Sequence, residues 1–160
     1  MRDTVPLEDV LHSATSALAV AGIESPRREA TRLWEGMHAA PAGTAILDRS
    51  VQLEAEIVRR FEAGVRRRAA GEPLAYVTGW AGFRRLELHI DRRALIPRPE
   101  TEGLVDLVLA RVQDGIAVDV GTGSGCIALA LASENPRLSV RANDNPGGPV
   151  ARGAGTRPRR

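Results

Sequence analysis

Apolar side chains recur at helical spacing through the first part of the chain, and glycines interrupt the pattern. Over residues 6–21 they fall every three or four positions, and Gly22 ends the run. Ser25-Pro26 indicates a second start, because serine suits the N-cap and proline suits the first position of a helix. A third helix is predicted over residues 51–70, where apolar residues lie four apart at Leu53, Ile57, Phe61 and Val65, and Gly71 is predicted to end it. We therefore predict a helical bundle domain over residues 1–70.

The pattern changes over residues 71–99, which we interpret as a hairpin and connector. Alternate positions from Leu86 to Ile90 are apolar and the positions between them are polar, as in a half-buried strand. Gly79 and Gly82 indicate a hairpin or tight turn before this strand. The prolines within residues 97–99 hold the backbone extended before the next element.

From residue 100 to residue 145 the pattern is that of an α/β domain. A helix over residues 100–112 is predicted to bury one side, made of Leu104, Val105, Leu107, Val108 and Leu109. A short buried strand, a glycine loop, a helix of small residues and a second strand follow, at 116–120, 121–125, 126–133 and 138–144. Together they predict one right-handed βαβ unit. The fold class is thus α/β, with the first part of a Rossmann-like domain over residues 100–145.

The last residues, 146–160, combine glycine, proline and arginine with a single sizeable apolar side chain, Val150. Such a segment buries too little surface to offset its ordering entropy, so we expect it to be disordered. It also carries the positive charge of the chain, since residues 1–145 hold 18 arginines and 20 acidic residues, a net charge of −2. The basic balance therefore does not indicate nucleic-acid binding. The arginines within residues 59–68 are interpreted as a solvated helix face.

Composition excludes several other classes of protein. No apolar run approaches the ~20 residues of a membrane span, and the first residues lack the long apolar stretch of a secretory signal. Cys126 is the only cysteine, so an internal disulfide is impossible and a reducing cytoplasm fits best. We interpret it as a small packed side chain. The three histidines are scattered and form no metal-ligand spacing, so no metal site is predicted.

The candidate chemistry lies in the glycine loop, which is written V-D-V-G-T-G-S-G over residues 118–125. Alternate glycines after a strand allow the backbone to approach a cofactor closely, and the following helix start offers unpaired N–H groups. Asp144 lies 23 residues beyond Gly121, a spacing that suits an acid binding both hydroxyls of a ribose. The candidate cofactor-binding residues are Asp119, Gly121, Thr122, Gly123, Ser124, Gly125 and Asp144.

Three nucleotide-type interpretations of this motif differ in their requirements. A phosphate-binding P-loop is excluded because no Gly-Lys-Ser/Thr follows the glycines. A nicotinamide-dependent oxidoreductase is disfavoured because its fingerprint needs glycine or alanine where this chain has Cys126. An acid two residues before G-x-G-x-G suits S-adenosylmethionine, which has no pyrophosphate to cradle. A glycine turn that only packs a helix on a strand remains the structural alternative.

Three blocks of the sequence resemble the HemK/PrmC family, the glutamine methyltransferases that modify peptide chain release factors. They are G-E-P-L-A-Y-V-T-G at residues 71–79, L-I-P-R-P-E-T-E at 95–102, and the glycine loop through Ile127. The resemblance covers roughly residues 7–145. It implies a helical domain of the release-factor-binding type, followed by part of a Rossmann-like methyltransferase domain. The implied reaction transfers a methyl group from S-adenosylmethionine to the glutamine amide nitrogen of the release factor's GGQ motif.

The resemblance also implies roles for individual residues. The loop at 121–125 would contact the methionine part of the cofactor, Asp144 would bind the ribose, and Asp119 would shape the pocket. The segment over residues 97–102 would line the mouth of the site, or would serve only as a proline-stiffened connector. Its candidate lining residues are Pro97, Arg98, Glu100 and Thr101. No residue receives a catalytic role.

The sequence departs from the family after Asp144. The family's substrate motif, Asn-Pro-Pro-Tyr, is absent, and Asn145-Pro146 is followed by two glycines. Because attack by an amide nitrogen depends on positioning, we expect no turnover, and a non-catalytic release-factor-binding fragment is the alternative. The abrupt change in composition suggests a frameshift near codon 145. A half-sheet also leaves an edge and one face uncovered, so we expect the helical domain to be the better protected part.

Overall fold

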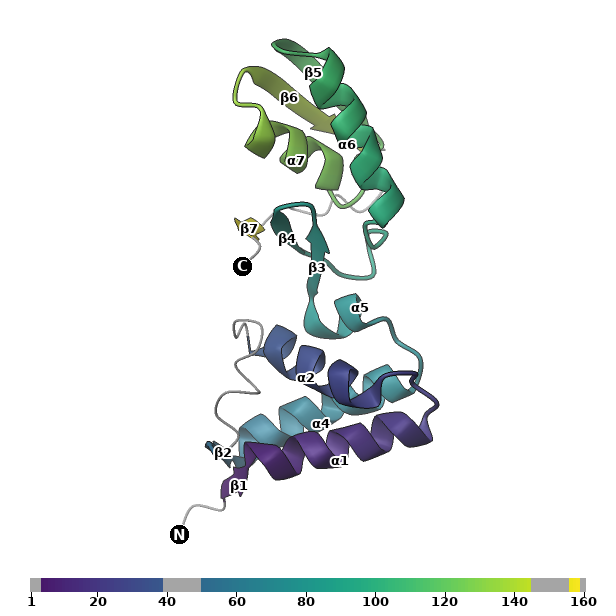
Figure 1. Ribbon diagram of the computed structural model, residues 1–160, viewed down its shortest axis with the longest axis vertical. Helices are drawn as coiled ribbons and strands as arrows, with labels where there is room; N and C mark the ends of the chain where they lie inside the picture. Colours follow the sequence, from purple (N-terminus) through teal and green to yellow (C-terminus); the bar gives the residue numbers. More distant parts are fainter. Residues whose placement is uncertain (1–3, 39–49, 145–155, 159–160) are drawn as a thin grey trace. The chain divides into compact units, whose positions relative to one another are not determined.

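The computed structural model describes residues 4–38, 50–144 and 156–158. They divide into two compact units, Met1–Gly79 and Trp80–Arg159, here called the helical unit and the α/β unit (Figure 1). The division falls later than the end of the predicted helical domain. The segment predicted as a connector therefore contributes a short helix to the first unit and a hairpin to the second.

The described part of the helical unit is built from helices and one short strand pair. The helices are α1 (Leu7–Val20), α2 (Pro26–Met37), α4 (Ala55–Ala69) and α5 (Leu74–Thr78). The strands β1 (Thr4–Pro6) and β2 (Gln52–Glu54) are antiparallel, with Val5 opposite Leu53. The helix predicted to begin at residue 51 therefore begins at Ala55, because the residues before it pair with a distant strand.

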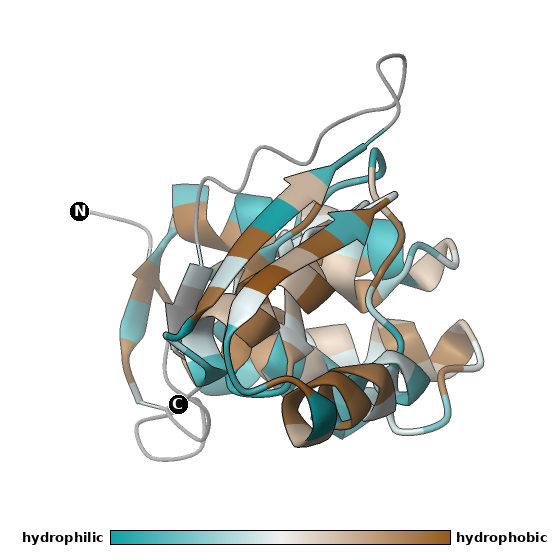
Figure 2. Cartoon of the chain, turned by 90° about the horizontal axis from the view of Figure 1, so that it is seen from above, coloured by the Kyte–Doolittle hydropathy of each residue, from teal (hydrophilic) through white to brown (hydrophobic). Residues whose placement is uncertain are grey.

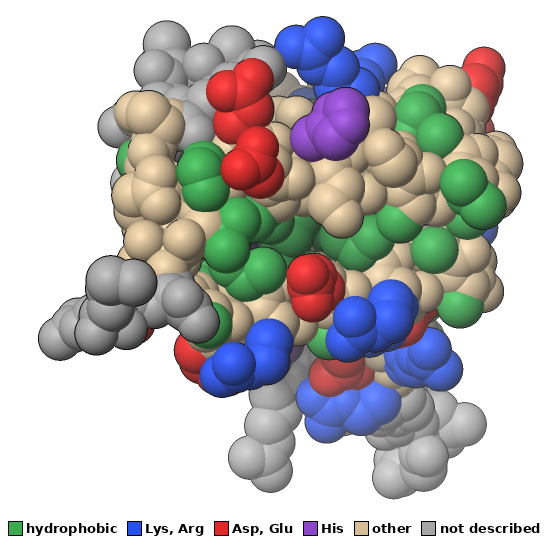
Figure 3. Space-filling view, turned by 90° about the horizontal axis from the view of Figure 1, so that it is seen from below, with side chains coloured by type: hydrophobic (Ala, Val, Ile, Leu, Met, Phe, Trp, Pro, Cys, Tyr) green, Lys and Arg blue, Asp and Glu red, His purple; other side chains and the backbone are tan. Residues whose placement is uncertain are grey.

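The core of the helical unit lies where α1 packs against α2 and α4. Leu18, Leu33 and Phe61 are completely buried, and Trp34 meets the Phe61 ring edge-on at 5.2 Å between centroids. Seen from below, this end of the chain shows a band of hydrophobic side chains flanked by charged ones (Figure 3). A shallow groove between α1 and α4 is lined by Val10, Ser13, Ala14, Ala17, Phe61, Glu62, Val65 and Arg66.

Two glycines end helices of this unit as the sequence predicts. Gly22 has φ 75°, its amide donates to the Ala19 carbonyl, and the Ile23 amide donates to the Leu18 carbonyl. This pair of bonds is a Schellman motif, and glycine adopts its left-handed conformation without steric cost. The same two bonds end α4, where Gly71 has φ 91°.

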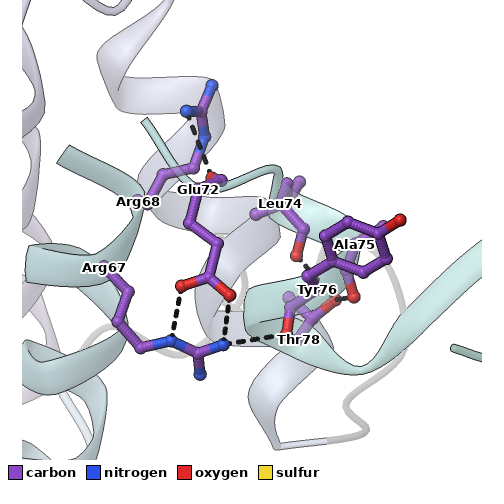
Figure 4. Close-up of polar contacts among 7 residues, drawn as sticks. All are labelled: Arg67, Arg68, Glu72, Leu74, Ala75, Tyr76 and Thr78. Carbon is purple, nitrogen blue, oxygen red and sulfur yellow. Dashed lines mark hydrogen bonds and ion pairs between the residues drawn. The ribbon is translucent and has the colours of Figure 1, made fainter. Parts of the chain in front are cut away.

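Two arginines of α4 are structural rather than simply solvated. Nε and Nη2 of Arg67 donate to the two carboxylate oxygens of Glu72 at 2.8 and 2.7 Å, and Nη2 also donates to the Tyr76 carbonyl (Figure 4). Arg68 donates to Glu29 of α2 at 2.6 Å. The prediction of a solvated face is therefore wrong for Arg68, which is partly buried, whereas Arg67 is exposed as predicted and also binds Glu72. Their partners follow the helix or lie on another helix, so the spacing of the arginines gave no sign of them.

The α/β unit begins with a hairpin and continues with a βαβ unit. Its elements are β3 (Trp80–Phe83), β4 (Leu86–His89), α6 (Pro99–Arg111), β5 (Gly115–Val120), α7 (Cys126–Glu134), β6 (Leu138–Asn143) and β7 (Thr156–Pro158). The strands β3 and β4 are antiparallel, while β5 and β6 are parallel and α7 connects them. Seen from above, apolar and polar residues alternate along β6, whereas β5 is mostly apolar (Figure 2).

Part of the C-terminal segment is a strand. β7 pairs antiparallel with β4, with Thr156 opposite Leu88. These three residues differ from the predicted disorder of 146–160, because a backbone ladder needs no apolar pattern in the strand that joins it. The rest of that prediction lies outside the described residues.

The helices α6 and α7 cover one face of the parallel pair. Their core contains Phe83, Leu88, Val105, Ala130 and Leu131, and Ala117 of β5 packs against it. On the opposite face, the side chains exposed at 61–80% are Ile116, Val118 and Val120. The prediction of a buried strand is therefore wrong for this face, which no element of the described residues covers.

The apolar side of α6 is also less buried than predicted. Of its five apolar residues only Val105 is fully buried, whereas Val108 and Leu109 are partly buried. Leu104 and Leu107 are about half exposed, at 48% and 53%. The helix packs on the hairpin and α7 through a narrow stripe, so the broader apolar pattern overstated its contact area.

Within the part of the chain that the structure describes, no helix has the length and apolar character needed to cross a membrane. In the same residues, no cluster of three or more His, Cys, Asp or Glu side chains has an arrangement suited to a metal ion.

Candidate cofactor site

The glycine loop connects β5 to α7 through three left-handed backbone positions. Gly121, Gly123 and Gly125 have φ values of 76°, 54° and 78°. Residues with a Cβ rarely adopt these angles, so glycine is required at each position for conformational reasons. The alternate glycines of the motif therefore coincide with three left-handed backbone positions.

The loop is fastened to the end of β6. The amides of Gly121 and Thr122 both donate to the Asn143 carbonyl, at 2.8 and 3.1 Å, and the Gly125 amide donates to the Thr122 carbonyl. Because Asn143 holds the loop, the partly buried Asp144 that follows it is adjacent to the loop as well. The structure thus brings together the glycine loop and the acid that the sequence selected 23 residues later.

Asp119 stabilises the loop by accepting two hydrogen bonds. The Thr122 hydroxyl donates to its Oδ2 at 2.7 Å, and the backbone amide of Ala128 donates to the same oxygen at 3.2 Å. Ala128 is the third residue of α7, so this carboxylate accepts one of the helix's unpaired N–H groups. A negative charge there is also favoured by the helix dipole. Asp119 therefore acts on the shape of the loop.

The outer side of the loop is open. A Cβ built at Gly121 or Gly123 would meet no atom within 4 Å, whereas one at Gly125 would lie 3.4 Å from Leu129 Cδ1. Among the described residues, the amides of Gly123 and Ser124 have no hydrogen-bond acceptor. The loop thus offers N–H donors beside free space, an arrangement that suits an anionic or polar group.

Cys126 follows the loop as the first residue of α7 and is buried. Burial raises the pKa of its thiol above the ordinary value, because the charged thiolate is poorly solvated there. The protonated thiol is a poor nucleophile. Its environment agrees with the prediction of a small packed side chain.

The predicted mouth segment lies at the start of α6. Arg98 occupies the N-cap in an extended conformation, and its backbone carbonyl accepts a hydrogen bond from the Thr101 amide at 3.0 Å. Pro99 is the first helical residue. Pro97 and Thr101 are partly buried, and Arg98 and Glu100 are exposed. No hydrogen bond among the described residues joins this segment to the glycine loop. Its place at the mouth of the site stays a prediction.

Arg84 is a residue of this unit that the sequence patterns did not select. It lies in the two-residue turn of the β3–β4 hairpin and contacts both helices of the unit. Its guanidinium binds both carboxylate oxygens of Glu134 at 2.6 and 2.8 Å, and binds Asp106 at 2.7 Å. Its backbone amide donates to Glu102 at 2.9 Å. These partners lie up to 50 residues away, so no local pattern indicates them.

The comparisons with known proteins agree on one family. Residues 9–79 match the PrmC N-terminal domain, and this match ends at the residue that closes the helical unit. The release factor glutamine methyltransferase of Vibrio cholerae is 41% identical over 143 residues, which are 88% of this chain and 50% of that protein. The enzyme of the same name from Lactococcus lactis is 44% identical over 62% of this chain and 35% of its own length.

A third relative, the release factor glutamine methyltransferase of Escherichia coli, is 41% identical over 136 residues, 84% of this chain and 48% of its own length. The chain spans about half the length of the curated relatives that it matches over most of its own length. The matched half includes the helical unit and continues into the α/β unit with its glycine loop. The chain therefore belongs, over the half that it spans, to the HemK/PrmC family.

Proposed function

We propose that the chain supplies the helical and cofactor-binding parts of a methyltransferase that modifies a glutamine of peptide chain release factors. The activity is taken from the curated relatives, which are named release factor glutamine methyltransferases. One observation supports the proposal most. The glycine loop and Asp144 lie together at the carboxyl ends of β5 and β6, where open α/β sheets bind their ligands.

S-adenosylmethionine fits the donor set of this site. When bound, it supplies a methyl group attached to a positively charged sulfur. The amides of Gly123 and Ser124 would hold its methionine carboxylate at the start of α7, where the helix dipole favours negative charge. The carboxylate of Asp144 would accept hydrogen bonds from the ribose hydroxyls. Asp119 would keep the loop in its turn.

The acceptor in this proposal is the side-chain amide of a glutamine. An amide nitrogen is a weak nucleophile, so the protein's contribution is chiefly to position it and to exclude water. The segment at the start of α6 would line the mouth of the site through Pro97, Arg98, Glu100 and Thr101. The helical unit, which matches the PrmC N-terminal domain, would contact the release factor. We place the reaction in the cytoplasm, where release factors act.

Calorimetric titration with S-adenosylhomocysteine, the unreactive product, tests the cofactor site. Asp144→Ala should weaken binding by roughly 1–3 kcal/mol, the range for hydrogen bonds to a charged acceptor. The matched control is Asp114→Ala, which removes an exposed acid of the same unit before β5 and should leave binding unchanged. Equal affinity of wild type and Asp144→Ala would remove Asp144 from the site.

A second titration separates the proposed cofactor from the nicotinamide alternative. The wild-type chain should bind S-adenosylhomocysteine and not NAD, because Cys126 occupies the position where the dinucleotide fingerprint needs glycine or alanine. Tight binding of NAD, with none of S-adenosylhomocysteine, would overturn the proposed function.

A further inference from the structure

The turn between β3 and β4 has an unusual backbone for the residue that occupies it. Phe83 and Leu86 are paired, so Arg84 and the residue after it form the whole turn. Arg84 has φ 51°, and it is the one non-glycine residue with positive φ among those described. This conformation is uncommon for a residue with a Cβ and carries a modest backbone cost. The hairpin turn and the contacts of the arginine side chain together offset that cost.

Those contacts come from two helices. From α6, the Glu102 carboxylate accepts the Arg84 backbone amide, and the Glu102 carbonyl accepts Nη1 at 3.1 Å. Asp106, one turn later, lies 2.7 Å from the same nitrogen. From α7, Glu134 binds the guanidinium through both of its oxygens. A planar guanidinium is suited to this bidentate geometry, and lysine cannot reproduce it.

The contact with Glu134 is shielded from water. The Arg84 and Glu134 side chains are 15% and 13% exposed, in contrast to 67% for Asp106. The hydrogen bonds to Arg84 lower the pKa of Glu134, and those to Glu134 are the largest cause raising the pKa of Arg84. Both groups therefore stay charged near neutral pH, and the pair is much less screened than a surface ion pair.

Both helices also carry parts of the candidate site. α6 begins at Pro99, directly after Pro97 and Arg98 of the mouth segment. α7 begins at Cys126, directly after the glycine loop, and ends at Glu134. A regular helix of this length transmits the position of its last turn to its first. Fixing Glu134 and Glu102 to one arginine therefore relates the mouth segment to the loop.

From this arrangement we propose that Arg84 is a positioning residue for the cofactor site. It holds the first turns of α6 and the whole of α7 in one arrangement; it contacts the mouth segment only at its last residue, Glu102, and makes no hydrogen bond to the loop. The inference rests on the proposed function for the identity of the cofactor. The claim that Arg84 fixes α6 and α7 relative to one another does not depend on which cofactor binds.

The test compares three variants of the full chain. Arg84→Met removes the guanidinium and keeps an apolar stem, and Arg84→Lys keeps the charge without the bidentate geometry. The matched control is Arg93→Met, because Arg93 also binds a carboxylate through two nitrogens, that of Asp91, but lies on an exposed loop. Each variant is titrated with S-adenosylhomocysteine at a temperature where circular dichroism shows it to be folded. Amide hydrogen exchange is followed over residues 99–103 and 121–128.

Arg84→Met should raise the Kd roughly fivefold or more, as expected for a coupled residue outside the site. It should speed exchange in both segments, while amides of the helical unit keep their rates. Arg84→Lys should fall between wild type and Arg84→Met, and Arg93→Met should match wild type. If Arg84→Met does not fold, Glu134→Gln replaces it with the same expectations, since it weakens the α7 side of the contact and keeps its shape.

Three outcomes count against the inference. If Arg84→Met lowers the unfolding temperature but binds S-adenosylhomocysteine as tightly as wild type, the residue is merely structural and the positioning role is overturned alone. If the wild-type chain itself does not bind the ligand, the proposed function fails, and the positioning role fails with it. Unchanged exchange over residues 99–103 would also refute the inference.

Discussion

In the helical unit, Leu18, Leu33 and Phe61 are completely removed from solvent, whereas in the α/β unit the outward side chains of β5 are 61–80% exposed. The two units differ because of their layers. Helices packed around one another enclose a core from all sides, but a parallel sheet is buried only when other elements cover both of its faces. α6 and α7 cover one face. Two units of similar apolar content can therefore differ in how completely they bury their apolar side chains, because their layers are arranged differently.

The polar contacts of the two units differ in the cores that they support. In the helical unit, the network around Glu72 joins α4 to the segment that immediately follows it and to α5, and through Arg68 it also reaches Glu29 of α2, 39 residues away. In the α/β unit, the network around Arg84 joins elements 18 and 50 residues apart. The network around Glu72 adds to a core that is already enclosed by helices. The network around Arg84 connects two helices that share only a small core. We therefore expect the helical unit to tolerate the loss of a polar contact better.

The largest effect is expected from Phe61→Ala. It removes a completely buried ring and should cost about 3–5 kcal/mol, enough to unfold the helical unit. Far-ultraviolet circular dichroism should show the loss of helix, while labelling of Cys126, in the other unit, should stay slow. The control Val20→Ala changes a side chain that is 92% exposed and should have little effect. Rapid Cys126 labelling in Phe61→Ala would show that the units unfold together, which would break the comparison.

A smaller effect is expected from Glu72→Gln. The substitution keeps the shape of the side chain but weakens two charged hydrogen bonds with Arg67. Because the Arg67 side chain is 48% exposed, we expect a loss of only about 1 kcal/mol in urea unfolding of the helical unit. Glu56→Gln, which breaks the exposed pair with Arg59, is the control and should cost less than about 0.5 kcal/mol. Equal losses of unfolding free energy in the two variants would show that Glu72 contributes no more than an exposed ion pair does.

The pH dependence of the α/β unit should reflect Glu134. Its folded pKa lies below the ordinary value of 4.5, chiefly because of its hydrogen bonds with Arg84. The stabilisation is therefore complete above pH 4.5 and is lost as the pH falls through the folded pKa. Thermal melts from pH 6 to pH 3 should lose more stability in wild type than in Glu134→Gln. Parallel pH curves for the two proteins would contradict this assignment.

The smallest effect is expected from Val118→Thr, on the uncovered face of β5. Its side chain is 61% exposed, so the unfolding free energy should change by less than about 0.5 kcal/mol. The matched change Val105→Thr, at a fully buried position of α6, should cost about 1–3 kcal/mol. Both are measured by urea unfolding with Cys126 labelling as the probe. If Val118→Thr is as costly as Val105→Thr, the outer face of β5 is covered in solution.

Features that depend on neighbouring residues were predictable from the sequence. Gly22 and Gly71 end their helices as predicted, because a left-handed cap requires only a glycine and the turn before it. The glycine loop is confirmed for the same reason, whereas the predicted hairpin turns at residues 84–85 and not at Gly82, which lies within β3. The proximity of Asp144 to the loop followed from the rule that neighbouring parallel strands end at the same edge. Its role with a cofactor stays a prediction.

Features that depend on distant partners were not predictable. Residues 52–54 continue a helical pattern but form β2, because Val5 and its neighbours pair with them. The pattern of β5 predicts a buried strand, and its exposed outer face was expected only from the incomplete sheet, not from the residues of the strand. Nothing in the sequence around Arg84 distinguishes it from an ordinary arginine in a turn, because its partners lie on two distant helices. In each case the structure depends on residues far away in the sequence, which a local sequence pattern does not include.

The closure of the helical unit within Met1–Gly79 also matters during synthesis. Its buried residues, among those that the structure describes, all precede Gly79, so this core needs nothing that is made afterwards. Ribosomes add about 5–20 residues per second, and domains that emerge first generally fold first, so the 81 residues after Gly79 take roughly 4–16 s to make. Helical units of local topology fold far faster than this. The nascent chain thus carries a finished helical unit before β6 exists to pair with β5.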